Sequence, residues 1–204
     1  REAGAEPAHV HLDRAAVERK IFPVRAPRAY DILFVVDNSP TMQSLQPILT
    51  ANAIKFVDVL RSLGGGLHNV HIGVISTDVG TAGGVPAAGC SSWGDAGAFF
   101  TGGVDIFDGR PFLSDIADPA RPGQRISNYR GTLTEAFSKM FALRPTQCRH
   151  TQPLRAISRA LLQADPSSPA ASFVRRDADL AIFIVSANDD CSLAPRILSQ
   201  VLPA

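Results

Sequence analysis

The chain has 204 residues, of which 45% are hydrophobic and 19% are charged, and its formal net charge at pH 7 is +1. This composition is typical of a single globular domain with a sizeable core, and the near-neutral charge argues against a nucleic-acid-binding surface. The longest apolar runs, residues 32–36 and 180–185, are far shorter than the roughly 20 residues of a membrane-spanning helix.

Residues 1–29 are rich in Ala, Arg and Pro and show no clear periodicity. We expect an irregular lead-in there, with a candidate short edge element at residues 17–24, followed by one domain over residues 30–204. His9 and His11 make a weak metal motif without further ligands, so we expect both to be exposed to solvent.

The first clear element is a strand that ends in a polar loop. Residues 32–36 are an unbroken apolar run, which predicts a strand buried on both faces. Asp37, Ser39 and Thr41 follow on the loop, before a helix that ends at the glycines 64–66. Side chains at helical spacing in this helix are Leu45, Ile48, Leu49, Asn52, Phe56, Val59, Leu60 and Leu63.

The spacing of Asp37, Ser39 and Thr41 allows their oxygens to turn toward one point. A few hard oxygen donors suit an ion such as Mg²⁺, which keeps several of its waters. The loop also lies where ligands bind in open α/β sheets, at the carboxyl ends of the strands. The alternative is that Asp37 and Ser39 only cap the following helix.

A second buried strand is predicted at residues 70–76, parallel to the first because a helix connects the two. Residues 79–131 are dense in Gly and Pro, and we expect a surface insertion with a hairpin around residues 98–104. The acidic residues of this segment lack an EF-hand pattern, so we expect them to be solvated. They are Asp95, Asp105, Asp108, Asp115 and Asp118.

Two helices and a third strand complete the predicted α/β domain. Thr132 and Glu135 form a capping box that opens one helix, and Pro153 lies in the first turn of the next. The apolar run at residues 180–185 predicts the third buried strand.

The motif Asp37-x-Ser39-x-Thr41 resembles the metal-ion-dependent adhesion site of von Willebrand factor type A domains, whose pattern is Asp-x-Ser-x-Ser. Residues 72–76 are similar to the second strand of that family. Cys90, with the Gly-Asp-Ala-Gly run that follows it, is similar to bacterial extracytoplasmic members.

The resemblance covers residues 29–192 and implies a doubly wound, three-layer α/β fold with a mostly parallel sheet. In the family, further strands normally follow the one at residues 180–185, and too little sequence remains here for them. We therefore expect an open sheet edge at that strand. Another chain would cover it, unless the sequence is a fragment of a longer protein.

In this family, a Thr and an Asp from two further loops complete the ion site. Thr146 lies where the family supplies its Thr, and Thr151 is the second candidate. Ala187 stands in the place of the family's last Asp, so Asp189 or Asp190 would have to reach further, or the site is degenerate. The resemblance thus implies metal ligands Asp37, Ser39, Thr41, Thr146 and Asp189. Because one acid is missing, we expect weak or partial occupancy by Mg²⁺, or by Mn²⁺ or Ca²⁺.

The resemblance implies a protein-binding module of the adhesion type, in which the ion binds a carboxylate of a partner protein. The alternative is a structural subunit of a surface or envelope assembly with a vestigial metal site. We do not expect an enzyme, because the dinucleotide-binding, P-loop and nucleophile-elbow motifs are all missing and no His has an identifiable nucleophile partner.

The three cysteines, Cys90, Cys148 and Cys191, include no Cys-x-x-Cys pair. Cysteine count alone leaves open three buried free thiols. If the fold is the one implied, Cys148 and Cys191 both follow elements that end at the same sheet edge, and we predict a disulfide between them. Such a bond requires an oxidising compartment: the periplasm, the outer membrane or the cell surface.

Overall fold

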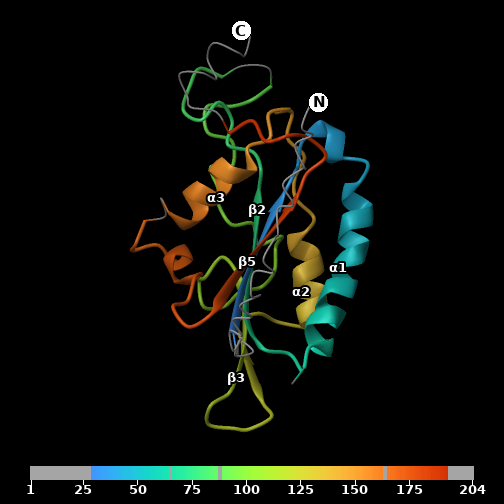
Figure 1. The fold of residues 1–204 in the computed structure, drawn as a ribbon, viewed down its shortest axis with the longest axis vertical. Coiled ribbons are helices and arrows are strands. Elements are labelled where there is room, and N and C mark those ends of the chain that lie inside the picture. The colour runs from blue at the N-terminus through green and yellow to red at the C-terminus, as the bar shows by residue number, and fades with distance from the viewer. Residues whose placement is uncertain (1–28, 65, 87–88, 163–164, 193–204) are drawn as a thin grey trace, which may run out of the picture.

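The computed structural model describes residues 29–64, 66–86, 89–162 and 165–192. Within them the strands are β1 (Ala29–Val36), β2 (Asn69–Ser76), β3 (Leu113–Ala117), β4 (Arg125–Ser127) and β5 (Asp179–Val185). The helices are α1 (Gln46–Ser62), α2 (Leu133–Met140) and α3 (Pro153–Leu161), with short 3₁₀ turns at Pro40–Met42 and Pro169–Ser172. Figure 1 shows three layers, with the sheet between α3 on one face and α1 and α2 on the other.

The five-stranded sheet has the order β4-β3-β2-β1-β5 and is mixed. Strand β1 pairs in parallel with β2, as the sequence predicts, and also with β5, whereas β3 is antiparallel to both β2 and β4. The prediction of a mostly parallel sheet is therefore wrong. A parallel neighbour needs a crossover, usually a helix. The described residues between β2 and β3 contain no helix, so the chain returns beside β2 in the opposite direction.

The Gly- and Pro-rich segment is part of the core rather than a surface insertion alone. It supplies the β3–β4 hairpin, and both Leu113, the first residue of β3, and Phe112, just before it, are fully buried. The prediction of a hairpin around residues 98–104 is wrong, because the described residues there contain no strand and Phe99 makes only an isolated bridge to Ile75. Asp115 and Asp118 are buried, against expectation. Asp115 pairs with the guanidinium of Arg125 and accepts a hydrogen bond from the hydroxyl of Tyr129 at 2.6 Å.

Alternating side chains of β1 build the two halves of the core. Phe34 faces α1 and α2, where its ring contacts Phe56 and Phe137 at centroid distances of 4.9 and 5.1 Å. Leu33 faces α3, in a second apolar cluster that includes Phe173. Since both faces of β1 are covered, it is buried along its length apart from partly buried Tyr30, as its unbroken apolar run predicts.

A buried charged cluster fixes the segment that leads into β5. The Asp31 carboxylate on β1 is fully buried and accepts hydrogen bonds from the backbone N–H of Arg175 at 2.5 Å and from its Nε at 2.8 Å. His71 on β2 lies beside it, with Nδ1 2.9 Å from the carbonyl oxygen of Phe173. Burial lowers the pKa of His71, and the nearby positive charge of Arg175 lowers it further.

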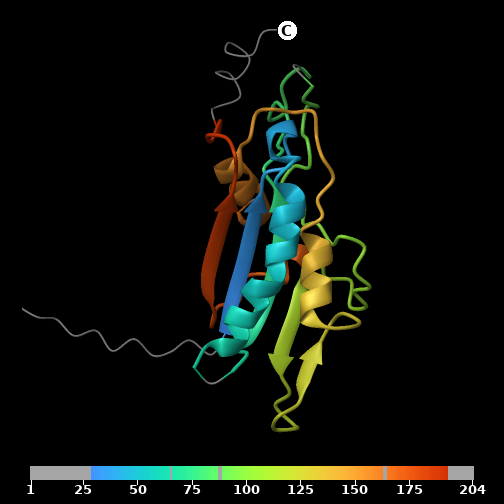
Figure 2. The ribbon, with the colours of Figure 1, turned by 90° about the vertical axis from the view of Figure 1, so that its right-hand side faces the viewer.

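Strand β5 forms one edge of the sheet, as expected, and no described element lies beyond it. In Figure 2 it runs along one side of the molecule, next to β1, and α1 does not cover it. Its outer hydrogen-bonding groups and both of its faces are therefore open in the described part of the chain. Leu180, Ile182, Phe183 and Ile184 are all exposed.

Among the described residues, no helix is long and apolar enough to cross a membrane. The lead-in at residues 1–28, with His9, His11 and the candidate edge element at residues 17–24, lies outside the described residues. The segment after Ser192 also lies outside them.

Candidate functional site

The predicted metal-site loop lies where β1 ends, beside the end of β5. Asp37 is the first residue after β1 and is fully buried. Its Oδ1 accepts a hydrogen bond from the backbone N–H of Ser39 at 2.8 Å. Its Oδ2 accepts three more, each at 3.1 Å, from Ser186 Oγ, Ala187 N and Asn188 Nδ2. The carboxylate is thus held by donors from its own loop and from the loop after β5.

Asn188 connects the three loop residues that the sequence singles out. Its Nδ2 donates to Ser39 Oγ at 3.0 Å as well as to Asp37, and its Oδ1 lies 3.5 Å from Thr41 Oγ1. Sequence reasoning missed this residue because it looked for an acid. A signal was available, since the chain after a strand parallel to β1 ends at the same sheet edge, and Asn188 is an amide in that chain.

The other predicted ligands take different positions. Thr146 lies beside the loop, where its backbone N–H donates to the carbonyl of Asn38 at 2.9 Å, but its hydroxyl accepts from the N–H of Cys148. Thr151 is buried and donates to the carbonyl oxygen of Asp189 at 2.8 Å, while the Asp189 side chain is exposed. Among the described residues, neither Thr146 nor Asp189 bonds to Asp37.

Asp190, the other acid considered for the site, bonds within its own loop. Its Oδ1 accepts hydrogen bonds from the N–H and hydroxyl of Ser192 at 2.9 and 2.5 Å. Asp37 is therefore the one carboxylate that the described loops bring to this point.

This arrangement does not fit Mg²⁺, Mn²⁺ or Ca²⁺. The described residues contain no group of three or more His, Cys, Asp or Glu side chains that could hold a metal ion. A cation at Asp37 and Ser39 needs oxygen lone pairs directed at it. Here the Nδ2 donor of Asn188 is hydrogen-bonded to both Asp37 and Ser39, in the position such an ion would need.

The disulfide joins Cys90 to Cys148, not Cys148 to Cys191 as predicted. The reason is where each loop is fixed. Gly89 packs against the main chain of Gln147, so the two loops that carry Cys90 and Cys148 lie side by side. Cys191 is tied elsewhere, by a hydrogen bond from its N–H to the carbonyl of Thr151, and it is the free cysteine. Burial and the charges of Asp190 and Asp189 raise the pKa of its thiol.

A second polar group joins the ends of β1 and β2 to the loop after β2. Asp95 accepts hydrogen bonds from Ser76 Oγ at 2.5 Å and from Asn38 Nδ2 at 3.3 Å. These residues line a cavity of about 120 Å³. Asp95 is exposed, as expected for the acids of this segment, but it has this structural role as well.

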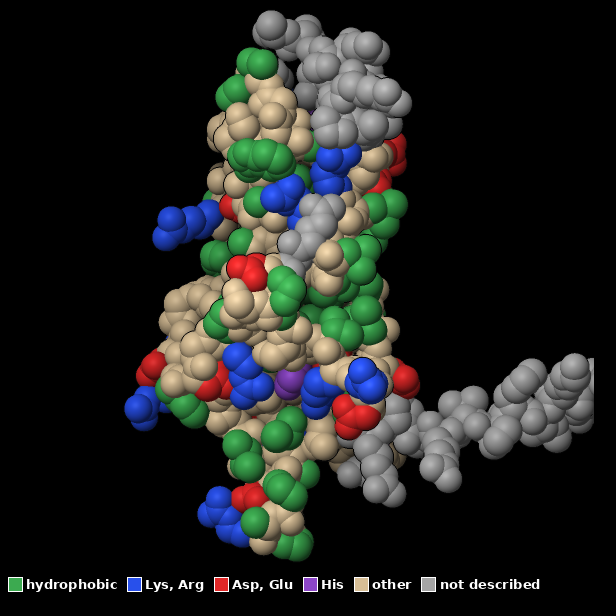
Figure 3. All heavy atoms as spheres, turned by 90° about the vertical axis from the view of Figure 1, so that its left-hand side faces the viewer, with side chains coloured by type: hydrophobic (Ala, Val, Ile, Leu, Met, Phe, Trp, Pro, Cys, Tyr) green, Lys and Arg blue, Asp and Glu red, His purple; other side chains and the backbone are tan. Residues whose placement is uncertain are grey.

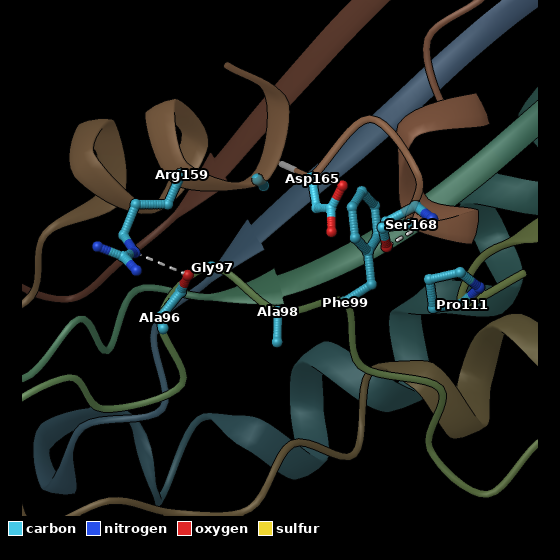
Figure 4. A pocket seen from close by; sticks show the side chains of 10 residues that line it. Ala96, Gly97, Ala98, Phe99, Pro111, Arg159, Asp165 and Ser168 are labelled. Carbon is cyan, nitrogen blue, oxygen red and sulfur yellow. Dashed lines mark hydrogen bonds between the residues drawn. The ribbon is translucent and has the colours of Figure 1, made fainter. Parts of the chain in front are cut away.

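A pocket of about 410 Å³ lies between α3 and residues 96–99. Figure 4 shows Arg159 turned toward Ala96, away from Asp165. Its Nε donates to the carbonyl of Ala96 at 3.0 Å, and its guanidinium lies 4.7 Å from the ring centroid of Trp93. Because the Arg159 cation is already engaged, the pocket offers a lining of mixed polar and apolar character, and the residues that line it include no nucleophile and base in contact.

Comparisons with protein-family models, with curated proteins and with solved structures find no match to this chain. Its function must therefore be inferred from its own residues.

Proposed function

We propose that this chain is a structural, protein-binding subunit of an extracytoplasmic assembly, joined to a second protein chain through the open edge of β5. The observation that carries this proposal is the exposure of apolar side chains on both faces of that strand. On one face Ile182 and Ile184 are 39% and 47% exposed, and on the other Phe183 is 43% exposed. Their neighbours on β1 are buried.

An apolar, unpaired edge strand is a site of association or aggregation, which native proteins normally cover. Figure 3 shows hydrophobic side chains gathered on the α3 face of the molecule, including the side where β5 lies. Because both faces of β5 are apolar, a single added strand would pair its backbone but leave its apolar side chains exposed to solvent. The partner therefore contributes a strand with apolar cover on each side.

The exposed surface continues from β5 onto α1. Phe56 of α1 contacts Phe183 at a ring-centroid distance of 5.6 Å. Ile48 and Val59 of α1 lie at helical spacing from Phe56, with the polar Asn52 between Ile48 and Phe56, and they are 61% and 56% exposed. These positions follow the helical pattern of a core-facing stripe but face outward. They extend the proposed partner surface on this face of the sheet.

The proposed compartment rests on the disulfide between Cys90 and Cys148. Disulfides persist in the periplasm and on cell surfaces and are rare in the cytosol. The bond links the loop after β2 to the loop before α3.

A second candidate function is adhesion through a Mg²⁺-type ion that binds a partner's carboxylate. The observation that favours it is the convergence of Asp37, Ser39 and Thr41 on one point. It would require Asn188 to leave that point first, which is why we place it second.

The test of the first proposal uses a charge at each edge of the sheet. Ile182→Lys places an ammonium on β5, and Ile126→Lys places the same group on β4, where Ile126 is 45% exposed. In size-exclusion chromatography of extracts from cells that make the protein, we expect the parent and Ile126→Lys to elute in a complex larger than one chain. Ile182→Lys should elute as a single chain with an unchanged circular dichroism spectrum. A parent that elutes as a single chain, or an Ile182→Lys variant that stays in the complex, would contradict the proposal.

A further inference from the structure

The side chain of Asn188 lies against the loop after β1, where it bonds to Asp37 and Ser39. We infer that the side-chain amide of Asn188 takes the place of a cation, so that the adhesion-type loop is complete without metal. Its Nδ2 is bonded to Asp37 Oδ2 at 3.1 Å and to Ser39 Oγ at 3.0 Å. This inference does not depend on the β5 proposal, and either can fail without the other.

An amide nitrogen is chemically suited to this role. Its two hydrogens carry partial positive charge, and the two acceptors here take one each. A buried carboxylate is costly unless hydrogen bonds satisfy it. Asp37 accepts from two backbone N–H groups and from Asn188, and the Ser186 hydroxyl, whose one proton the Asn188 carbonyl also attracts, lies within hydrogen-bond distance as a fourth donor. The oxygens of this buried carboxylate thus have protein donors and do not need an ion to satisfy them.

The loop after β5 holds Asn188 in position. The N–H of Asn188 donates to Ser186 Oγ at 3.1 Å, and this hydroxyl lies 2.8 Å from the carbonyl oxygen of Asn188. The backbone N–H of Asp37 donates to the carbonyl of Val185 at 2.9 Å, which fixes the ends of the two strands together. The amide orientation follows from its partners, because only Nδ2 can donate to the Asp37 carboxylate.

An ion that displaced Asn188 would find a poor site. It would meet one carboxylate and the hydroxyls of Ser39 and Thr41, and it would leave Asp37 with one donor fewer. Charge count and rigidity set cation affinity. Replacing Asn188 by Asp supplies a second carboxylate at the same point. Without metal, the carboxylate introduced by Asn188→Asp and that of Asp37 repel each other, and a bound cation would relieve this repulsion.

The experiment is calorimetric titration with Mn²⁺ of the parent, Asn188→Asp and the control Asn52→Asp, with thermal unfolding in Mn²⁺ and in EDTA. Asn52→Asp adds the same charge on the exposed surface of α1. We expect no saturable binding by the parent or by Asn52→Asp. Asn188→Asp should bind one Mn²⁺, with a Kd at least ten-fold below any weak binding by the parent. It should also melt at a lower temperature in EDTA than in Mn²⁺.

If Asn188→Asp does not fold, Asn188→Ala tests the same inference, because it removes the side-chain amide without adding charge. It should bind Mn²⁺ more tightly than the parent. Saturable one-site binding by the parent that Asp37→Ala abolishes would overturn the inference. So would Asn188 variants that fold and bind Mn²⁺ no better than the parent.

Discussion

At the scale of single residues, buried polar side chains hold the loops and strand ends of this protein in register. Asp37 does so at the carboxyl edge of the sheet, and Asp31 does so near the opposite end of β1. Both carboxylates are fully buried, and both are satisfied by groups distant in sequence. Each therefore couples β1 to the segment that contains β5.

Replacing Arg175 by Ala is expected to destabilise the protein strongly. The Arg175 side chain is mostly buried and donates from Nε to Asp31 at 2.8 Å and from Nη2 to the carbonyl of Tyr30 at 3.0 Å. Removing one partner of a buried pair leaves an uncompensated charge, which typically costs about 3–5 kcal/mol. Urea unfolding measures this loss. Exposed Arg176 is the control, and Arg176→Ala should change the unfolding free energy by less than about 0.5 kcal/mol. Equal losses for both variants would show that Arg175 does not act through Asp31.

At the scale of elements, local chemistry made several features predictable. The capping box of Thr132 and Glu135 forms at the start of α2, and Pro153 is the first residue of α3. Strands β1, β2 and β5 follow their apolar runs. Strand β3 was missed because Leu113–Ala117 is short and mixes apolar and polar residues, so only its pairing with β2 defines it.

The site was predictable only in part, for a similar reason. The spacing of Asp37, Ser39 and Thr41 places them on one loop by local geometry. Their contact with Asn188 spans about 150 residues and depends on the strand beside β1 and on the turn after it. Likewise, three cysteines do not specify their pairing. The pairing depends on which loops the fold brings together, and here Gly89 and Gln147, the neighbours of the paired cysteines, lie in contact.

Loss of the disulfide between Cys90 and Cys148 should lower stability without changing the fold. It joins residues 58 positions apart, and in the chain-entropy model a loop of that length stabilises the folded state by about 4 kcal/mol. The Cys90→Ser/Cys148→Ser protein should therefore unfold at lower urea concentration than the parent. Thiol labelling of the denatured parent without reductant should modify Cys191 alone. Modification of all three cysteines, or of Cys90 in place of Cys191, would rule out this pairing.

At the scale of the whole molecule, the two edges of the sheet formed by the described residues differ in length and in exposed apolar surface. The β4 side ends in a short strand, which limits edge pairing. The β5 side ends in seven residues, most of them apolar and exposed. This asymmetry is why we propose that β5, rather than the loop at Asp37, is where the partner protein binds.

The most direct measurement places a photo-crosslinking amino acid at position 182 and, as control, at position 126 in the cells that make the protein. Illumination with and without EDTA is followed by mass analysis of the adducts. We predict an adduct between two chains at position 182, equally in both conditions, and none at position 126. An adduct that EDTA abolishes would show that partner binding depends on a metal ion. A crosslink confined to one chain, or none at position 182, would contradict partner binding through β5.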